Sequence, residues 1–300
     1  MLDQEYPNLE YFVMDGGSTD GSQEIIARYA HRLAGWVSER DRGQADAINK
    51  GFSRATGDVV AWINSDDYYL PGSLRAAVEA LQANPACGMV FGDVLAVNGE
   101  GQPINVMTYG NWDLEDLMQF RIIGQPSVFM RRSVLERAGP LDLSFHYLLD
   151  HHLWLRVAQH APIRYIPQRL SAARYHASAK NVAMAGEFGK EAYRLVDWMA
   201  AQPGLADRYS RLRRRIWAGA NRIAGFYLLD AGQSGPALRA YLRSLWAYPP
   251  TALPEMRRIA FAAASLVFKV DLLRDRYLAS RKQRVTAQLK KEKDQPLAGK

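Results

Sequence analysis

Two adjacent carboxylates, Asp66 and Asp67, directly follow an apolar run and are the clearest candidates for chemistry. The run VVAWI at residues 59–63 is predicted to be a buried strand, and it stops at Asn64-Ser65-Asp66-Asp67. Mg²⁺ and Mn²⁺ take oxygen ligands and are typically held by one or two carboxylates together with substrate phosphates. The alternative is structural, because carboxylates also cap helix N-termini. The pattern favours a metal site that neutralises a leaving diphosphate, with a helix cap as the plainer interpretation.

Two further carboxylates stand at the ends of predicted elements. Asp15 follows the apolar run 9–14, and an aspartate beyond the carboxyl end of a strand can accept from a nucleobase or a ribose. By itself such a residue is more often part of an ordinary turn. Asp150 begins a predicted helix, where it could act as a general base or as an N-cap. His151 and His152 point in different directions on that helix, which argues against a shared metal site.

The elements that must position these residues alternate between strand and helix over the first two-thirds of the chain, as in an α/β domain. We expect strands at residues 9–14, 35–38, 59–63, 89–97 and 127–130, and helices at 23–33, 44–55, 71–82, 132–138 and 151–160. From about residue 186 the strand signals vanish and helical spacing takes over. Residues 217–231 and 236–247 are predicted to form a helical hairpin.

Composition narrows the class of protein. The 300 residues carry 48% hydrophobic and 23% charged side chains, as in an ordinary globular protein, and the single cysteine excludes an internal disulfide and fits a reducing compartment. The net charge of +7 comes largely from basic runs at residues 211–215 and 281–293. A solvated helix face is the commoner origin of such runs, although they can attract an anionic membrane surface. No aromatic pattern of an RNA-binding module accompanies them, so no nucleic-acid partner is expected.

The chain start and its most apolar stretch give no membrane-spanning signal. Residues 1–5 have neither a basic nor an apolar run, so no signal peptide is expected there. The apolar stretch at residues 259–268 is too short to cross a bilayer and is predicted to pack against neighbouring helices.

Four segments together resemble glycosyltransferase family 2. They are YPNLEYFVMDGGSTDGS (residues 6–22), ERDRGQADAINKGFSRATGDVVAWINSDDYYLPGSL (39–74), GQPSVFMRRSVLERAGPLD (124–142) and LLDHHLWLRVA (148–158). Their order and spacing make the resemblance specific over about residues 3–182. It implies an α/β fold of the GT-A type, a Rossmann-like mixed sheet flanked by helices, over residues 1–185. A helical region at 186–280 and a charged tail at 281–300 are expected to follow.

The resemblance assigns the nucleotide side of the site to five residues. Asp15 and Ser18 are similar in position to the residues that face the nucleobase. Arg42, Asp46 and Asn49 lie in the second nucleotide-facing loop and helix.

The resemblance also implies a metal and a catalytic base. Asp66 occupies the position of the main ligand for Mn²⁺ or Mg²⁺ in the family's DXD motif, with Asp67 supporting it and Ser65 contacting ribose or phosphate. Gln125 falls in the loop that faces the sugar and the acceptor. Asp150 matches the family's catalytic base.

The chain departs from the family pattern at several positions. Asn64 replaces the first aspartate of the DXD motif, as in a large subgroup, while Leu149 and His152 replace residues that are often acidic beside the base. His176, in a segment similar to a later family motif, is a further expected metal or diphosphate contact.

The resemblance begins after the family's first strand, loop and helix, so this first βα unit is expected to be absent from residues 1–300. Its loss would expose strand edges and weaken nucleotide binding. A start placed too late is favoured over a shortened protein as the reason.

These inferences predict an inverting, metal-dependent glycosyltransferase that moves a sugar from a nucleotide-diphosphate sugar to a glycan or lipid-linked acceptor in cell-surface polysaccharide synthesis. The expected location is cytoplasmic, with peripheral contact at the inner face of the membrane. The alternative is a catalytically impaired nucleotide-binding or adaptor protein of the same fold. A nucleotidyltransferase is disfavoured because no glycine-rich triphosphate loop stands near the chain start.

Overall fold

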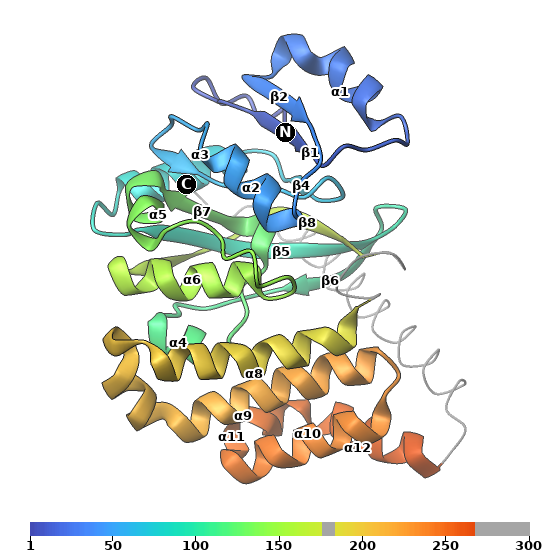
Figure 1. Ribbon diagram of the computed structural model, residues 1–300. Coiled ribbons are helices and arrows are strands. Elements are labelled where there is room, and N and C mark those ends of the chain that lie inside the picture. The colour runs from blue at the N-terminus through green and yellow to red at the C-terminus, as the bar shows by residue number, and fades with distance from the viewer. Residues whose placement is uncertain (176–183, 268–300) are drawn as a thin grey trace, which may run out of the picture.

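A mixed sheet lies at the centre of the computed structural model, which describes residues 1–175 and 184–267 (Figure 1). Its strands are β3 (Val59–Val60), β4 (Tyr68–Tyr69), β5 (Met89–Asn98), β6 (Pro103–Met107), β7 (Val128–Arg131) and β8 (Ile163–Tyr175). They run in the order β3-β7-β5-β8-β4, with β6 also paired to β5. The central pair β5–β8 is parallel, whereas β3–β7, β5–β7, β4–β8 and β5–β6 are antiparallel.

Strand β8 is one that the sequence did not predict. It carries Pro167 and several arginines and lacks a regular alternation of apolar and polar residues. The register against β5 shifts on either side of Asp93, so that residues around Pro167 bulge out of the ladder. A proline has no N–H to donate, and a bulge is where a strand tolerates one.

A second, two-stranded sheet carries the N-terminal part of the candidate site. Strands β1 (Phe12–Asp15) and β2 (Gly35–Ser38) pair in parallel and are joined through α1 (Ser22–Tyr29). Within residues 1–175 and 184–267, β1 pairs only with β2, and β3 pairs only with β7. Among the described strands, β1 and β3 thus each have one edge without a strand partner.

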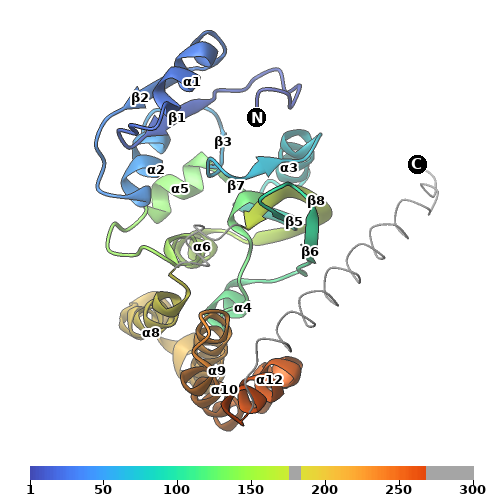
Figure 2. The same ribbon diagram turned by 90° about the vertical axis from the view of Figure 1, so that its right-hand side faces the viewer.

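Helices cover the sheet and then form a further layer (Figures 1 and 2). Those of the first part are α2 (Gln44–Phe52), α3 (Ser73–Gln82), α4 (Leu114–Met118), α5 (Arg132–Ala138) and α6 (Leu149–His160). The later ones are α8 (Ala185–Ala201), α9 (Ala206–Asp230), α10 (Ser234–Ala247), α11 (Pro249–Ala252) and α12 (Met256–Val267). None of the described helices is both long enough and apolar enough to cross a bilayer.

Predicted and observed elements differ where sequence patterns are weak. The strands expected at residues 35–38, 89–97 and 127–130 are confirmed to within one residue, whereas the one expected at 59–63 pairs only at Val59–Val60 because β3 has a partner on one side. Helix α9 begins at Ala206 instead of residue 217, since its basic first half hides the apolar period. Strand β6 and helix α4 lie in a stretch where no element was expected.

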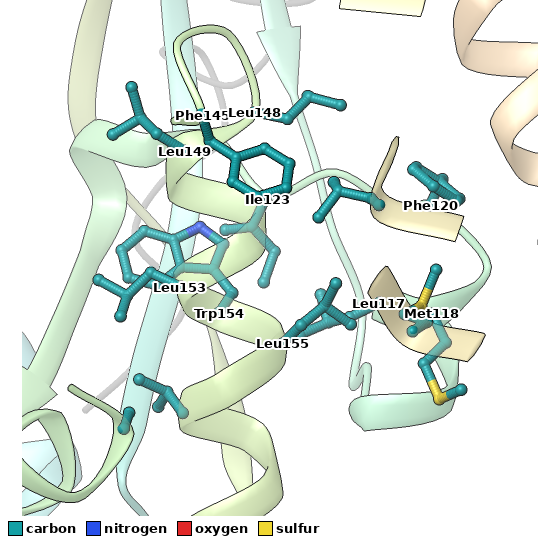
Figure 3. Close-up of a cluster of buried hydrophobic side chains, with 14 of the residues drawn as sticks. Leu117, Met118, Phe120, Ile123, Phe145, Leu148, Leu149, Leu153, Trp154 and Leu155 are labelled. Carbon is teal, nitrogen blue, oxygen red and sulfur yellow. The ribbon is translucent and has the colours of Figure 1, made fainter. Parts of the chain in front are cut away.

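One continuous core joins the sheet, α6 and the later helices. Trp154 of α6 is fully buried, and its ring centroid lies 5.2 Å from that of Trp62. Figure 3 shows Trp154 among Ile123, Phe145 and Leu153. The same cluster extends to buried side chains of α8 and α9. Helix α6 therefore lies between the sheet and the helical layer, and both sides fix its position. The division into domains at residue 185 stays a prediction.

Helix α9 approaches the segment after α4 closely at Gly219. A Cβ atom at this position would lie 2.1 Å from the carbonyl oxygen of Gln119. Close by, Nη2 of Arg222 donates to the carbonyl of Phe120 over 2.7 Å. The helical layer is thus docked on the loop between β6 and β7 by a backbone contact that only glycine permits.

We expect Gly219→Ala to lower the free energy of unfolding by about 1–3 kcal/mol, because the methyl group must push Gln119 away. Chemical denaturation of the full chain measures the change. Gly235→Ala is the matched control, since a Cβ there meets its nearest atom, Cδ2 of Leu266, at 3.7 Å. The control should gain up to about 1 kcal/mol from helix propensity. Equal stability of Gly219→Ala and the wild type would contradict the proposed close packing.

Candidate active site

A cavity of about 2000 Å³ runs from the unpaired edges of β1 and β3 past the ends of the central strands to the helical layer. It brings together five predicted site residues, which are Ser65, Asp66, Asp67, Gln125 and Asp150. The other described candidates, Asp15, Ser18, Arg42, Asp46 and Asn49, do not line it.

A chain of side-chain amides holds the turn that follows β3. Nε2 of Gln44 donates to Oδ1 of Asn64 over 2.8 Å, and Nδ2 of Asn64 faces both Oδ2 of Asp67 and Oε1 of Gln125 at 3.3 Å. Nε2 of Gln125 in turn donates to the carbonyl of Trp62 over 2.8 Å. An asparagine at position 64 supplies both a donor and an acceptor, so it can link α2, the turn and the loop of Gln125.

The two carboxylates of this turn are held from the end of β8. The backbone N–H of Arg174 donates to Oδ1 of Asp67 over 2.9 Å, and Nε of Arg174 donates to the carbonyl of Asp66 over 3.2 Å. Burial raises the pKa of Asp67 to about 6, with the negative charge of Asp66 adding to the rise and the Arg174 amide opposing it. Asp67 is therefore mostly ionised at neutral pH while being tied into the fold.

The pair Asp66 and Asp67 fits a divalent cation that completes its shell with substrate phosphates. Both carboxylates line the cavity, and hard oxygen donors are what Mg²⁺ and Mn²⁺ prefer. In the described part of the chain no three His, Cys, Asp or Glu side chains are grouped to hold a metal. His176, the expected additional contact, lies outside the described residues.

Asp15 closes the first strand in a tight hydrogen-bonded turn. Its Oδ2 accepts from the backbone N–H of Ser18 over 2.9 Å and from Oγ of Ser38 over 2.6 Å, and its Oδ1 accepts from Oγ of Ser18. Ser38 lies directly opposite Asp15 in the β1–β2 register. The hydroxyl of Ser18, followed by that of Ser38, lowers the pKa of Asp15 to about 2. Asp15 is thus a permanently charged acceptor at the carboxyl end of a strand.

The second predicted nucleotide segment is occupied by internal contacts. Nη2 of Arg42 donates to Oδ1 of Asp46 over 2.9 Å, and Asp46 also faces Nζ of Lys50 at 3.6 Å. Asn49 exchanges two hydrogen bonds with the backbone of Leu141, at 2.9 and 2.8 Å. Asn49 thereby ties α2 to the segment that leads into α6. Nucleotide contacts by Arg42, Asp46 and Asn49 stay a prediction.

Asp150 lies in the first turn of α6 and faces the cavity between the sheet and the helical layer. Its Oδ1 accepts from the backbone N–H of His151 over 2.7 Å. Burial raises the pKa of Tyr109 and of Tyr227, and the negative charge of Asp150 adds to both shifts. Tyr227 belongs to α9, so the helical layer contributes to the surroundings of the candidate base.

The residue that fixes the start of α6 is Glu191 of α8, which sequence reasoning missed. Its buried carboxylate accepts from three consecutive backbone N–H groups, those of His146 at 2.6 Å, Tyr147 at 2.7 Å and Leu148 at 2.7 Å. The N-cap residue Leu148 makes no side-chain cap bond of its own. A carboxylate beside a helix N-terminus also interacts favourably with the helix dipole. Glu191 therefore places Asp150 from outside the α/β part of the chain.

A signal for Glu191 was present in the sequence. The apolar stripe of α8 includes Phe188, Leu195 and Met199, all buried. Glu191 occupies the same stripe at helical spacing. A carboxylate on an apolar helix face must find a partner, because its burial without hydrogen bonds would be costly.

His151 and His152 are core residues. Both are almost fully buried, and Nε2 of His151 lies 3.0 Å from the carbonyl of Leu117. The ring of His152 packs between Phe145 and Trp198, at centroid distances of 4.3 and 4.5 Å. Burial lowers the pKa of His151 to about 4 and that of His152 to about 3. Within the described residues neither histidine belongs to a group of three possible metal ligands.

The mixed sheet, its flanking helices and the helical C-terminal layer define a fold of the GT-A glycosyltransferase class. Residues 1–137 match the family model described as glycosyl transferase family 2.

Curated relatives agree with this family. An uncharacterized glycosyltransferase of Nostoc sp. is 30% identical over 154 residues, which cover 47% of this chain and 48% of the relative. The putative teichuronic acid biosynthesis glycosyltransferase TuaG of Bacillus subtilis is 28% identical over 148 residues, covering 48% and 57%. The matched region thus spans about half the length of each relative.

Solved structures share the fold over most of the chain. S. aureus TarS (residues 1–349) aligns with a TM-score of 0.53 and 16% identity, over 85% of both chains. A mannosyltransferase of Pyrobaculum calidifontis, solved with GDP-Man and Mn²⁺, aligns with a TM-score of 0.54 and 22% identity, over 93% of this chain and 77% of that one. Both alignments extend beyond the family match into the helical layer.

We expect Ser18→Ala to raise the pKa of Asp15 from about 2 towards its ordinary value, since the Ser18 hydroxyl is the largest cause of the shift. A carbon-detected NMR titration of the Asp15 carboxyl measures this change. Ser22→Ala is the control, because Oγ of Ser22 donates to Asp20 instead. An unchanged Asp15 pKa in Ser18→Ala would refute the role given to this hydrogen bond.

Proposed function

We propose that this protein is an inverting glycosyltransferase that moves a sugar from a nucleotide-diphosphate sugar to an acceptor hydroxyl. The observation that carries the proposal is that one cavity holds both an Asp66–Asp67 pair suited to a divalent cation and, apart from it, the Asp150 carboxylate at a helix start. A single displacement needs a cation that stabilises the leaving diphosphate and a carboxylate that takes the proton of the attacking hydroxyl.

The reaction follows from these positions. Asp150 accepts the proton of the acceptor hydroxyl as its oxygen attacks the anomeric carbon. The bond from that carbon to the diphosphate breaks, and its electron pair leaves with the nucleotide. Mn²⁺ or Mg²⁺ held by Asp66, with Asp67 in support, would neutralise the charge that develops on the diphosphate. One displacement inverts the anomeric configuration.

The chain's other residues supply binding and orientation. Asp15, with Ser18, would accept hydrogen bonds from the nucleobase or ribose, and Ser65 and Gln125 would face the ribose or phosphate and the sugar. Arg42, Asp46 and Asn49 would border the nucleotide.

Neighbouring structures support a nucleotide-sugar donor, since TarS is described in complex with UDP-GlcNAc and the mannosyltransferase with GDP-Man and Mn²⁺. The name of TuaG supports a role in cell-surface polysaccharide synthesis. We place the reaction on the cytoplasmic side, with peripheral contact at the inner face of the membrane and a glycan or lipid-linked acceptor. Nucleic acid is not among the proposed partners.

The unpaired edges of β1 and β3 favour one second candidate, a nucleotide-binding protein without catalysis. Calorimetry with UDP and GDP, with and without Mn²⁺, separates the candidates together with a hydrolysis and transfer assay. Metal-dependent binding that Asp66→Ala removes, with no turnover of any nucleotide sugar, would support the second candidate and overturn the first.

We expect Asp150→Asn to reduce turnover of the nucleotide sugar by about 10²–10⁴-fold, the usual contribution of a general base. Nucleotide affinity should stay unchanged, because Asp150 lies apart from the Asp66–Asp67 turn. The control is Asp197→Asn, which removes an exposed carboxylate on α8. Full activity in Asp150→Asn would exclude this residue as the base.

We expect Glu191→Gln to lower kcat by about ten- to a hundredfold while the KM for the donor changes little, because a small displacement of Asp150 misaligns the attack. The amide of Gln keeps one acceptor oxygen and replaces the other with an NH2 donor, so the three N–H groups are held less well. The control Glu187→Gln lies on the same helix, where Glu187 pairs with Lys190 among the described residues. A rise in donor KM with unchanged kcat would argue against positioning of Asp150.

A further inference from the structure

Four arginines of α9 share one face of the helix. Arg208, Arg211, Arg215 and Arg222 follow one another at intervals of three, four and seven residues. These intervals return to the same side of an α-helix, so the four side chains form a stripe along α9. The stripe is directed towards α4 and the segment behind it, where Arg222 binds the carbonyl of Phe120. Figures 1 and 2 both place α4 between the sheet and α9.

The stripe carries more positive charge than its partners offset. Arg208 and Arg211 share a single carboxylate, that of Glu115. Arg222 faces Oε1 of Glu255 at 3.5 Å. Arg215 is exposed, and among the described residues it forms no ion pair. Two carboxylates thus face four guanidinium groups.

Part of this stripe borders the cavity that contains Asp150. Arg215 and Arg222 line it together with Tyr248, and the guanidinium of Arg215 lies 4.9 Å from the centroid of the Tyr248 ring. Arg121, which follows the Phe120 carbonyl bound by Arg222 and pairs with Asp116, stacks 5.5 Å from the centroid of the Trp112 ring, and both residues line the same cavity. The end of the cavity at the helical layer therefore combines arginines with flat aromatic faces.

We propose that this end of the cavity is the acceptor subsite, and that it binds a polyhydroxylated chain carrying repeated anionic groups, phosphate or carboxylate. The inference rests on the proposed function for the side on which the acceptor lies. Arginine forks pair with phosphate and carboxylate oxygens, while aromatic faces take the apolar faces of sugar or polyol units. Arginines about two turns apart on a helix, such as Arg208 and Arg215, suit charges that recur along a polymer.

The position of Arg215 favours a polymer over a bilayer surface. Arg215 and Arg222 line a cavity that Trp112 and Arg121 also line, and a planar membrane cannot enter such a space. A flexible chain can enter the cavity at Arg215 and reach Asp150, which lines the same cavity.

Direct binding to the full chain tests the subsite without requiring turnover. The probes are oligogalacturonate, oligomeric glycerol phosphate and neutral dextran oligomers of matched length, titrated by calorimetry at low and high salt. We expect both anionic probes to bind at least about tenfold more tightly than dextran, in line with charge-assisted hydrogen bonds, and to weaken with salt. The stronger of the two anionic probes identifies which group the subsite prefers.

The decisive variants are Arg215→Glu and its control Arg213→Glu. Both reverse one exposed arginine on α9, but residue 213 lies on another face and does not line the cavity. Arg215→Glu should lower the affinity for the anionic probes by about tenfold or more, and Arg213→Glu should leave that affinity nearly unchanged. Equal losses in both variants, or dextran binding as tightly as the anionic probes, would overturn the proposal.

Vesicles of phosphatidylglycerol are the last probe. One outcome is that the vesicles bind the protein and that Arg215→Glu weakens their binding as much as it weakens binding of the oligomers. In that case the stripe recognises a membrane surface and the acceptor subsite is refuted. Loss of oligomer binding alone supports the subsite. Because none of these measurements uses a donor, an absence of sugar transfer would count against the proposed function and leave the binding result intact.

Discussion

The carboxylate of Glu191 is the interaction on which the arrangement of the site most depends. It accepts from three consecutive backbone N–H groups just ahead of α6, those of His146, Tyr147 and Leu148. Burying a carboxylate or a backbone N–H group without a hydrogen-bond partner costs free energy, whereas the hydrogen bonds between them offset that cost. Because the carboxylate comes from α8, the helical layer is required for the position of Asp150. The layer is therefore part of the candidate active site.

The donor side is built by the same means, from contacts between segments far apart in the chain. Arg174 at the end of β8 holds the Asp66–Asp67 turn, and Gln44 reaches from α2 to Asn64. The β1–β2 pair that carries Asp15 forms a separate sheet. Among its contacts with the remainder of the described chain are those between β1 and α2.

Much of the α/β part could be predicted, because its strands are apolar runs that end in polar turns. Asp66, Asp67 and Asp150 were found in this way, and the structure brings them to one cavity. Strand β8 escaped prediction because Pro167 and its arginines hide the strand pattern. Glu191 escaped because its partners are backbone amides, so the sequence showed only an acidic residue on the apolar stripe of α8 and not what it binds. Contacts of this kind appear only once the chain is folded.

Amide hydrogen exchange at His146, Tyr147 and Leu148 tests the central claim most directly. These residues precede α6 and belong to no strand or helix. Their backbone N–H groups donate to the carboxylate of Glu191. Exchange rates follow the opening of such bonds. Our account predicts that the three amides exchange as slowly as those inside α6. Exchange at the rate of an exposed loop would contradict it.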